Sequence, residues 1–119
     1  MPHLVFTSPL SLAQLAERFE PTHESADDIH VHLMNAFTGH SAVMVETHVA
    51  EPTITQHIAL VIVKRDTAAS AVNEYTIQLS TLGQPRPTEG IHRAVCLLGV
   101  WALRLHPDNR ILKEKVNQT

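Results

Sequence analysis

Histidine is unusually frequent in this chain, and several histidines stand at spacings that suit metal binding. Nine of the 119 residues are histidine. In the alternating stretch IHVHL (29–33), His30 and His32 are two residues apart and therefore lie on the same face of a predicted strand. Two imidazoles at this spacing can bind one metal ion.

A second group of possible ligands comes from two longer strand-like runs, 41–50 and 53–64. A turn centred on Glu51-Pro52 would pair Val49 with Ile54 and place the apolar residues of both runs on one face. Because proline cannot adopt the positive φ of a tight type I′ turn, we expect a loop slightly longer than two residues.

This predicted hairpin, residues 41–64, places Glu46 opposite His57, with His48 beside them on the same polar face. Carboxylate and imidazole groups are ligand types that suit zinc and related metals. Glu46, His48 and His57 are therefore the candidate metal ligands, without a CxxC or HExxH motif to accompany them. The alternative interpretation is a half-exposed sheet face that simply carries polar residues.

A possible anion site lies in the loop LGQPRP (82–87), where Arg86 stands between two prolines. The loop leads into a long helix for which Thr88 is a suitable N-cap residue. Because helix N-termini attract anions, Arg86 and the first amides after Thr88 could together hold a carboxylate. The alternative interpretation is a rigid connector without a ligand.

The elements that must position these residues follow from the periodicity of the apolar positions. A short helix is expected after residue 7: Ser8-Pro9 has the pattern of an N-cap followed by proline at the first helical position, and the capping-box pattern from Ser11 to Gln14 is an alternative start. The stretch THESADD (22–28) is expected to be a polar connector. The strands are predicted at 2–7, 29–33, 41–50, 53–64, 74–80 and 111–116, and the long, very apolar helix at 88–106.

We therefore expect one α+β domain over residues 1–119, with a mixed β-sheet and both helices on one face. The order of elements is interpreted as two β-α-β units, with residues 41–64 as an inserted β-hairpin.

Charge and composition argue against several classes of protein. The chain has 9 Lys and Arg against 12 Asp and Glu, with no basic cluster larger than Lys64-Arg65, so nucleic acid is not an expected partner. The longest apolar run, 94–105, is too short to span a bilayer and contains Arg104, so no membrane association is expected. The single cysteine, Cys96, and the lack of a leader-like start predict a cytoplasmic protein.

Two stretches carry a resemblance to a known family. A chain of this length that begins MPHLVF and repeats a β-α-β unit resembles the tautomerase superfamily, which includes macrophage migration inhibitory factor. The stretch CLLGVWALRLHPDNRILKEKV (96–116) is similar to the final helix, turn and strand of that branch. The first helix is shorter than is usual there, and only Pro2 corresponds to a functional residue of the family by position.

The resemblance implies an isomerase that moves a proton on a small keto or enol acid. Removal of Met1 would leave the Pro2 nitrogen as a secondary amine, with a pKa that an apolar pocket and a nearby cation would lower from about 7.7–8.0. A neutral amine of this kind can act as the general base, and Arg86 would bind the substrate or stabilise the enolate oxygen. The resemblance also implies a homo-oligomer, specifically a trimer, and no cofactor is predicted.

Two alternatives to the isomerase remain open. The first is a non-catalytic domain that oligomerises or binds another protein through the hairpin 41–64 and the apolar helix. The second is a histidine-rich metal-binding module.

Overall fold

The computed structural model describes residues 2–39, 41–65, 72–80 and 85–115, with side chains described as far as Leu112. These residues form seven strands and two helices: β1 (His3–Ser8), α1 (Leu12–Glu17), β2 (Thr22–Ala26), β3 (Ile29–Thr38), β4 (Ala42–Ala50), β5 (Thr55–Arg65), β6 (Asn73–Leu79), α2 (Glu89–Arg104) and β7 (Arg110–Lys115).

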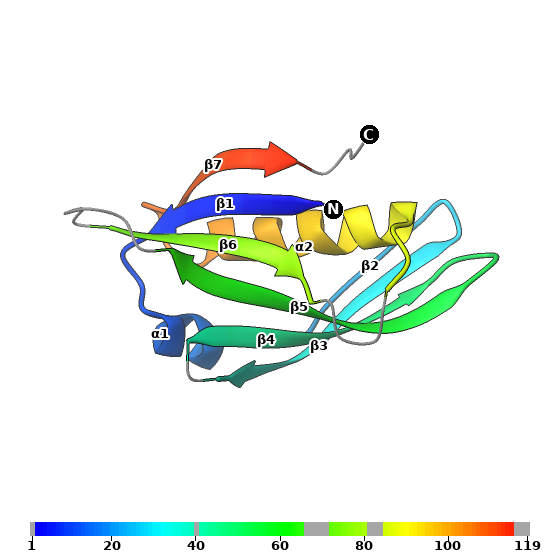
Figure 1. The fold of residues 1–119 in the computed structure, drawn as a ribbon, viewed down its shortest axis with the longest axis horizontal. Helices are drawn as coiled ribbons and strands as arrows, with labels where there is room; N and C mark the ends of the chain where they lie inside the picture. Colours follow the sequence, from blue (N-terminus) through cyan, green and yellow to red (C-terminus); the bar gives the residue numbers. More distant parts are fainter. Residues whose placement is uncertain (1, 40, 66–71, 81–84, 116–119) are drawn as a thin grey trace.

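All seven strands belong to one sheet in the order β2-β3-β4-β5-β6-β1-β7, and every neighbouring pair is antiparallel. The sheet is curled like half of a barrel, and α2 lies along it (Figure 1). The fold is therefore closer to all-β than to the predicted α+β arrangement.

The predicted mixed sheet and the two β-α-β units are wrong. They assumed that each helix returns the chain to a strand that pairs in parallel with the strand before the helix, whereas every pair in the sheet is antiparallel. Helix α1 leads from β1, near one edge, to β2 at the opposite edge, and these two strands run in opposite directions. Strands β4 and β5 lie in the middle of the sheet, so residues 41–64 are not an insertion into it. Periodicity identifies a strand but contains no information about its neighbours.

The β4–β5 register differs from the predicted one by two residues. Val49 pairs with Gln56 instead of Ile54, and a four-residue loop, residues 51–54, joins the strands. The loop is closed by the Glu51 N–H, which donates to the Ile54 carbonyl at 2.8 Å. Because the shift is an even number of residues, every side chain keeps its predicted face.

Strand β2 was predicted to be a connector. Its five residues are half-buried or exposed, so THESA shows no alternation between buried and exposed positions. The strand is identified only by its pairing with β3, from Thr22 opposite Leu33 to Ala26 opposite Ile29. An edge strand that buries nothing gives no hydrophobic signal in the sequence.

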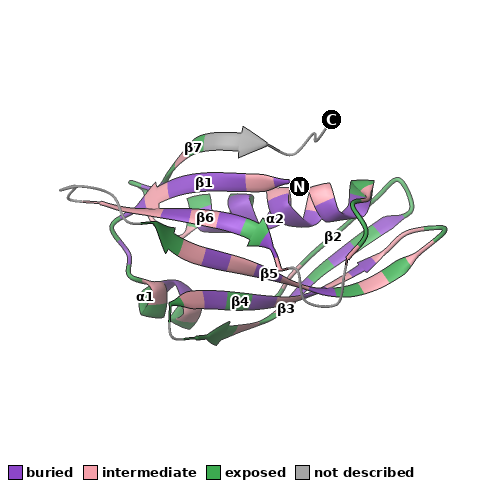
Figure 2. Cartoon of the chain, in the orientation of Figure 1, coloured by how far each residue is buried: buried purple, intermediate pink, exposed green. Residues whose placement is uncertain are grey.

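The concave face of the sheet forms one apolar core with α2 (Figure 2). Gly99 of α2 allows the close approach of β1, since a Cβ at this position would lie 2.7 Å from Leu4 Cδ1. The largest fully buried side chains are Tyr75, Phe6, Leu4, Leu15, Leu33, Leu60, Ile62, Ile77, Ile91 and Leu98. At roughly 2 kcal/mol for each buried aliphatic side chain, this core is the main source of stability.

Local signals set the ends of both helices. Helix α1 begins at the alternative start, where Ser11 and Gln14 form a capping box, so the interpretation of Ser8 as the N-cap residue is wrong: Ser8 is the last residue of β1. Thr88 is the N-cap residue of α2, as predicted. No helix among the described residues is long and apolar enough to cross a membrane.

Candidate functional site

Arg86 lies just before α2 and is held by its backbone. Its N–H donates to Gln56 Oε1 at 2.8 Å, and its carbonyl accepts from Gln56 Nε2 at 3.2 Å. A carboxylate already occupies the N-terminus of α2, because Glu51 accepts from the Gly90 N–H at 3.1 Å and from the Thr88 hydroxyl at 2.5 Å. The chain itself thus supplies the carboxylate that the sequence pattern predicts at this end of the helix.

Pro2 is buried and directly precedes β1. Strand β6 lies between β1 and β5, the strand whose Gln56 holds Arg86, so the described contacts do not bring Pro2 and Arg86 together. Met1 lies outside the described residues. The proposed general base at Pro2 and the proposed substrate contact at Arg86 therefore stay predictions.

The predicted metal ligands form part of a larger arrangement on the convex face of the sheet. His23, His32, His48 and His57 lie directly opposite one another across β2, β3, β4 and β5. We call these four residues the histidine row. The sequence pattern indicates its members on β3, β4 and β5 but misses His23, because β2 was predicted to be a connector.

Imidazole rings within the row lie close together, and His30 is linked to the row through Ser25. The ring centroids of His23 and His32 are 4.2 Å apart, and those of His48 and His57 are 5.7 Å apart. Ser25 Oγ lies 2.7 Å from His23 Nε2 and 2.7 Å from His30 Nδ1, so one hydroxyl links two imidazoles. Because the hydroxyl carries one proton, at most one of these imidazoles accepts a hydrogen bond from Ser25.

Glu46 lies at the β5 end of the row. Its Oε2 is 3.1 Å from His57 Nε2, and its Oε1 accepts from Asn35 Nδ2 at 2.8 Å. Glu46 pairs directly with Ala59, and His48 takes the position opposite His57, which corrects the predicted Glu46–His57 register. Within the described residues, no three His, Cys, Asp or Glu side chains are arranged to hold a metal ion.

Desolvation and three neighbouring histidines affect the pKa of His32. Desolvation lowers the pKa of His32 below its ordinary value of 6.5, and the nearby imidazoles of His23, His48 and His30 lower it further. Each neighbouring imidazole acts in this direction because two positive charges at this separation repel.

A groove lies between the end of α1 and the C-terminal half of α2, and its volume is about 290 Å³. The apolar side chains of Leu97, Val100, Trp101 and Leu105 line it from α2 and the residue after it. We call this cavity the α1–α2 groove.

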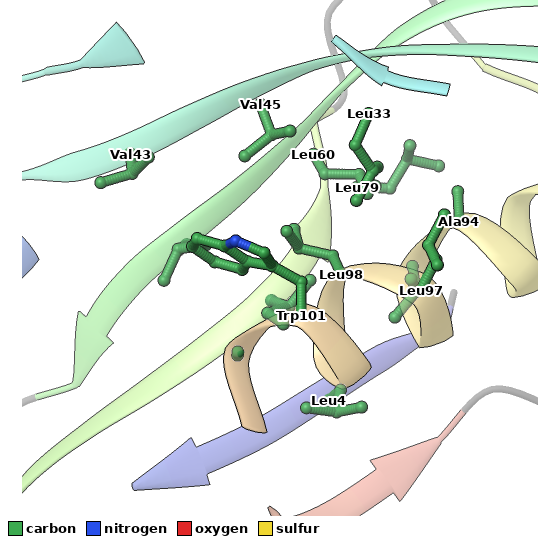
Figure 3. Close-up of a cluster of buried hydrophobic side chains, with 14 of the residues drawn as sticks. Leu4, Leu33, Val43, Val45, Leu60, Leu79, Ala94, Leu97, Leu98 and Trp101 are labelled. Carbon is green, nitrogen blue, oxygen red and sulfur yellow. The ribbon is translucent and has the colours of Figure 1, made fainter. Parts of the chain in front are cut away.

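Tertiary packing brings two arginines to the α1–α2 groove. Arg18 is the C-cap residue of α1, and Arg104 is the last residue of α2. Phe19, next to Arg18, packs on Trp101 with ring centroids 5.4 Å apart, which fixes the end of α1 against α2. The indole of Trp101 reaches into the core beside Leu98 (Figure 3) and also lines the groove.

The charged side chains of the α1–α2 groove have no ion-pair partner within the described part of the chain. Among the described residues, neither Arg18 nor Arg104 forms an ion pair, and Glu20, which also lines the groove, lies in none. Arg104 is favourable at the C-terminus of α2 on account of the helix dipole. The sequence offered one signal for this site, a charged residue in the otherwise apolar run 94–105.

Comparison with protein-family models, with curated proteins and with solved structures found no match for this chain. The resemblance to the tautomerase superfamily therefore has no support from these comparisons.

Proposed function

We propose that this protein binds a small organic acid with an apolar body in the α1–α2 groove. The observation that carries the proposal is an apolar lining combined with two guanidinium groups, those of Arg18 and Arg104, which form no ion pair with any described residue. Ligand sites are typically apolar cavities with a few polar groups that set the orientation of the ligand.

The charges of the groove favour an anion. Two arginines and one glutamate, Glu20, leave a net positive charge at the rim. A guanidinium presents paired N–H donors that match the geometry of a carboxylate, and it remains charged at any relevant pH. The carboxylate of the ligand would lie between Arg18 and Arg104, and its apolar body would lie on Val100 and Trp101.

The only tryptophan of the chain, Trp101, makes this proposal simple to test. We expect octanoate to change the fluorescence of Trp101 in a saturable way at pH 7.5. For a ligand with ten heavy atoms, about 0.5 kcal/mol per atom predicts a Kd of roughly 0.1–1 mM. Octanol has the same apolar body without the charge, and we expect it to bind more weakly.

Arginine variants locate the carboxylate. We expect Arg18→Gln and Arg104→Gln each to raise the Kd for octanoate about fivefold, the effect of losing one exposed charge pair. The matched control is Arg86→Gln, at the other end of α2, which should leave the Kd unchanged. Absence of a saturable signal would reject the proposal, and a large effect of Arg86→Gln alone would move the anion site to the predicted position.

We also propose a cytoplasmic location. The support is the composition of the chain, in which one cysteine, Cys96, excludes a disulfide within the chain.

A further inference from the structure

The histidine row and the neighbouring His30 join an edge strand of the sheet, β2, to its centre. None of the residues of β2 is buried. Besides the backbone pairing with β3, Ser25 Oγ lies 2.7 Å from His30 Nδ1 of β3, and Arg93 of α2 donates to the Ala26 carbonyl and to Asp27 Oδ2, each at 2.9 Å. A strand with so little buried surface can open locally at low cost.

The two ends of the histidine row differ in what protonation would do. At the β5 end, a protonated His57 gains a charge partner because Glu46 Oε2 is 3.1 Å away. At the β2 end, His23, His30 and His32 form no ion pair with a carboxylate among the described residues. Protonation there adds positive charges at cross-strand distances, and no carboxylate of the described residues lies within ion-pair distance to offset them.

The other groups around the row come from every strand that carries it. On the convex face these are Ser25 and His30, which share a hydrogen-bond network with His23, and Asn35, which donates to Glu46. The charged groups near Arg93 are Glu24, Asp27 and Glu89, and Asp28 lies beside Asp27 in the turn of the hairpin. Arg93 forms an ion pair with Asp27, so that carboxylate is already engaged.

We propose that the β2 end of the histidine row is a pH-sensitive lock, which holds β2 on β3 when its imidazoles are neutral and releases β2 when they are protonated. Release exposes the backbone edge of β3 and leaves the rest of the sheet paired. It also removes Thr22 from the wall of the α1–α2 groove, a consequence that rests on the proposed function, whereas the release itself does not.

The direction of the pH dependence follows from His32. Its pKa is lower in the folded chain than the ordinary value of 6.5, so the released state binds more protons. Between the unfolded and the folded pKa, stability therefore rises with pH and falls as the solution is acidified below about 6.5. Above this range the lock is closed.

Hydrogen exchange measured by mass spectrometry at pH 7.5 and pH 5.5, corrected for intrinsic rates, tests the lock. We expect protection of the β2 amides to fall about fivefold to tenfold at pH 5.5, while protection of β6, which carries no histidine, changes little. Equal changes in β2 and β6 would overturn the proposal.

Variants separate the row from general acid effects. The double variant with His23→Gln and His32→Gln should retain β2 protection at pH 5.5, and the control His92→Gln, on α2, should lose it like the wild type. Loss of protection in the double variant equal to that of the wild type would overturn the proposal. If the amides of β2 in the double variant are already unprotected at pH 7.5, the variant gives no comparison. In that case the wild-type comparison of β2 with β6 at the two pH values tests the proposal.

Discussion

The two ends of α2 differ in whether their charged side chains have partners within the described residues. At the N-terminus, the carboxylate of Glu51 accepts hydrogen bonds from Thr88 and Gly90, so the chain itself satisfies the helix end. At the C-terminus, Arg104 and the neighbouring Arg18 form no ion pair among the described residues and border an apolar groove. The first end is a structural contact, and the second has the features of a binding site.

This difference shows why a helix N-terminus is weak evidence for a ligand. The sequence pattern around Arg86 predicts an anion at the N-terminus of α2, and an anion is there, but it belongs to the β4–β5 loop. Glu51 is 38 residues before Glu89 in the sequence, and only the fold shows that it reaches the helix. A charged side chain that forms no ion pair with any described residue is stronger evidence for a ligand than a helix N-terminus is.

The largest effect should come from removing the carboxylate at the N-terminal end. We expect Glu51→Ala to lower the free energy of unfolding by roughly 2 kcal/mol, because two helix-capping hydrogen bonds are lost in a half-buried position. Urea denaturation at pH 7.5 measures this loss.

The matched control for Glu51 is Glu20→Ala at the α1–α2 groove. Because Glu20 forms no ion pair among the described residues, its removal should change the free energy of unfolding by less than about 0.5 kcal/mol. Equal unfolding midpoints for the two variants would break the distinction between the two ends.

The N-cap residue should have a smaller effect. We expect Thr88→Ala to cost about 1 kcal/mol, since Thr88 Oγ1 accepts from the Ile91 N–H and donates to Glu51. In the Glu51→Ala background the same change should cost less, because the two residues share a hydrogen bond. Urea denaturation of a double-mutant cycle measures this coupling, and Thr53→Ala, in an exposed loop, is the control.

Salt should give the smallest effect, and it should weaken ligand binding at the C-terminal end of α2 without changing the contact at the N-terminal end. Raising NaCl from 0.1 M to 0.5 M shortens the Debye length from about 10 Å to roughly 4 Å. We therefore expect the Kd for octanoate to rise twofold to threefold, while that for octanol and the stability cost of Glu51→Ala stay constant. A salt-independent octanoate Kd in the fluorescence titration would argue against the two arginines as the charge partners.

The two proposed sites were accessible from the sequence to different degrees. His30, His32, His48 and His57 stand in alternating runs, so the sequence places them on the polar faces of strands. The α1–α2 groove has no comparable signal, since Arg18 and Arg104 are far apart in the chain and line one groove only in the folded protein, where Phe19 packs on Trp101.

The sequence by itself determined the local elements of this protein. The capping box at Ser11, the N-cap at Thr88 and the alternation in 29–33 act between residues a few positions apart, so they are readable without a fold. The face of each hairpin residue was determined in the same way, because a shift of two residues preserves it.

The neighbours of each strand, the existence of β2 as a strand, and the charged side chains that form no ion pair within the described residues became known from the folded chain alone. Strand order depends on how the concave face packs on α2, and this packing involves residues of the whole core together. Strand β2 exists because β3 offers it backbone hydrogen bonds, although its own side chains bury nothing. Such properties arise from contacts between distant segments, and no short stretch of sequence contains them.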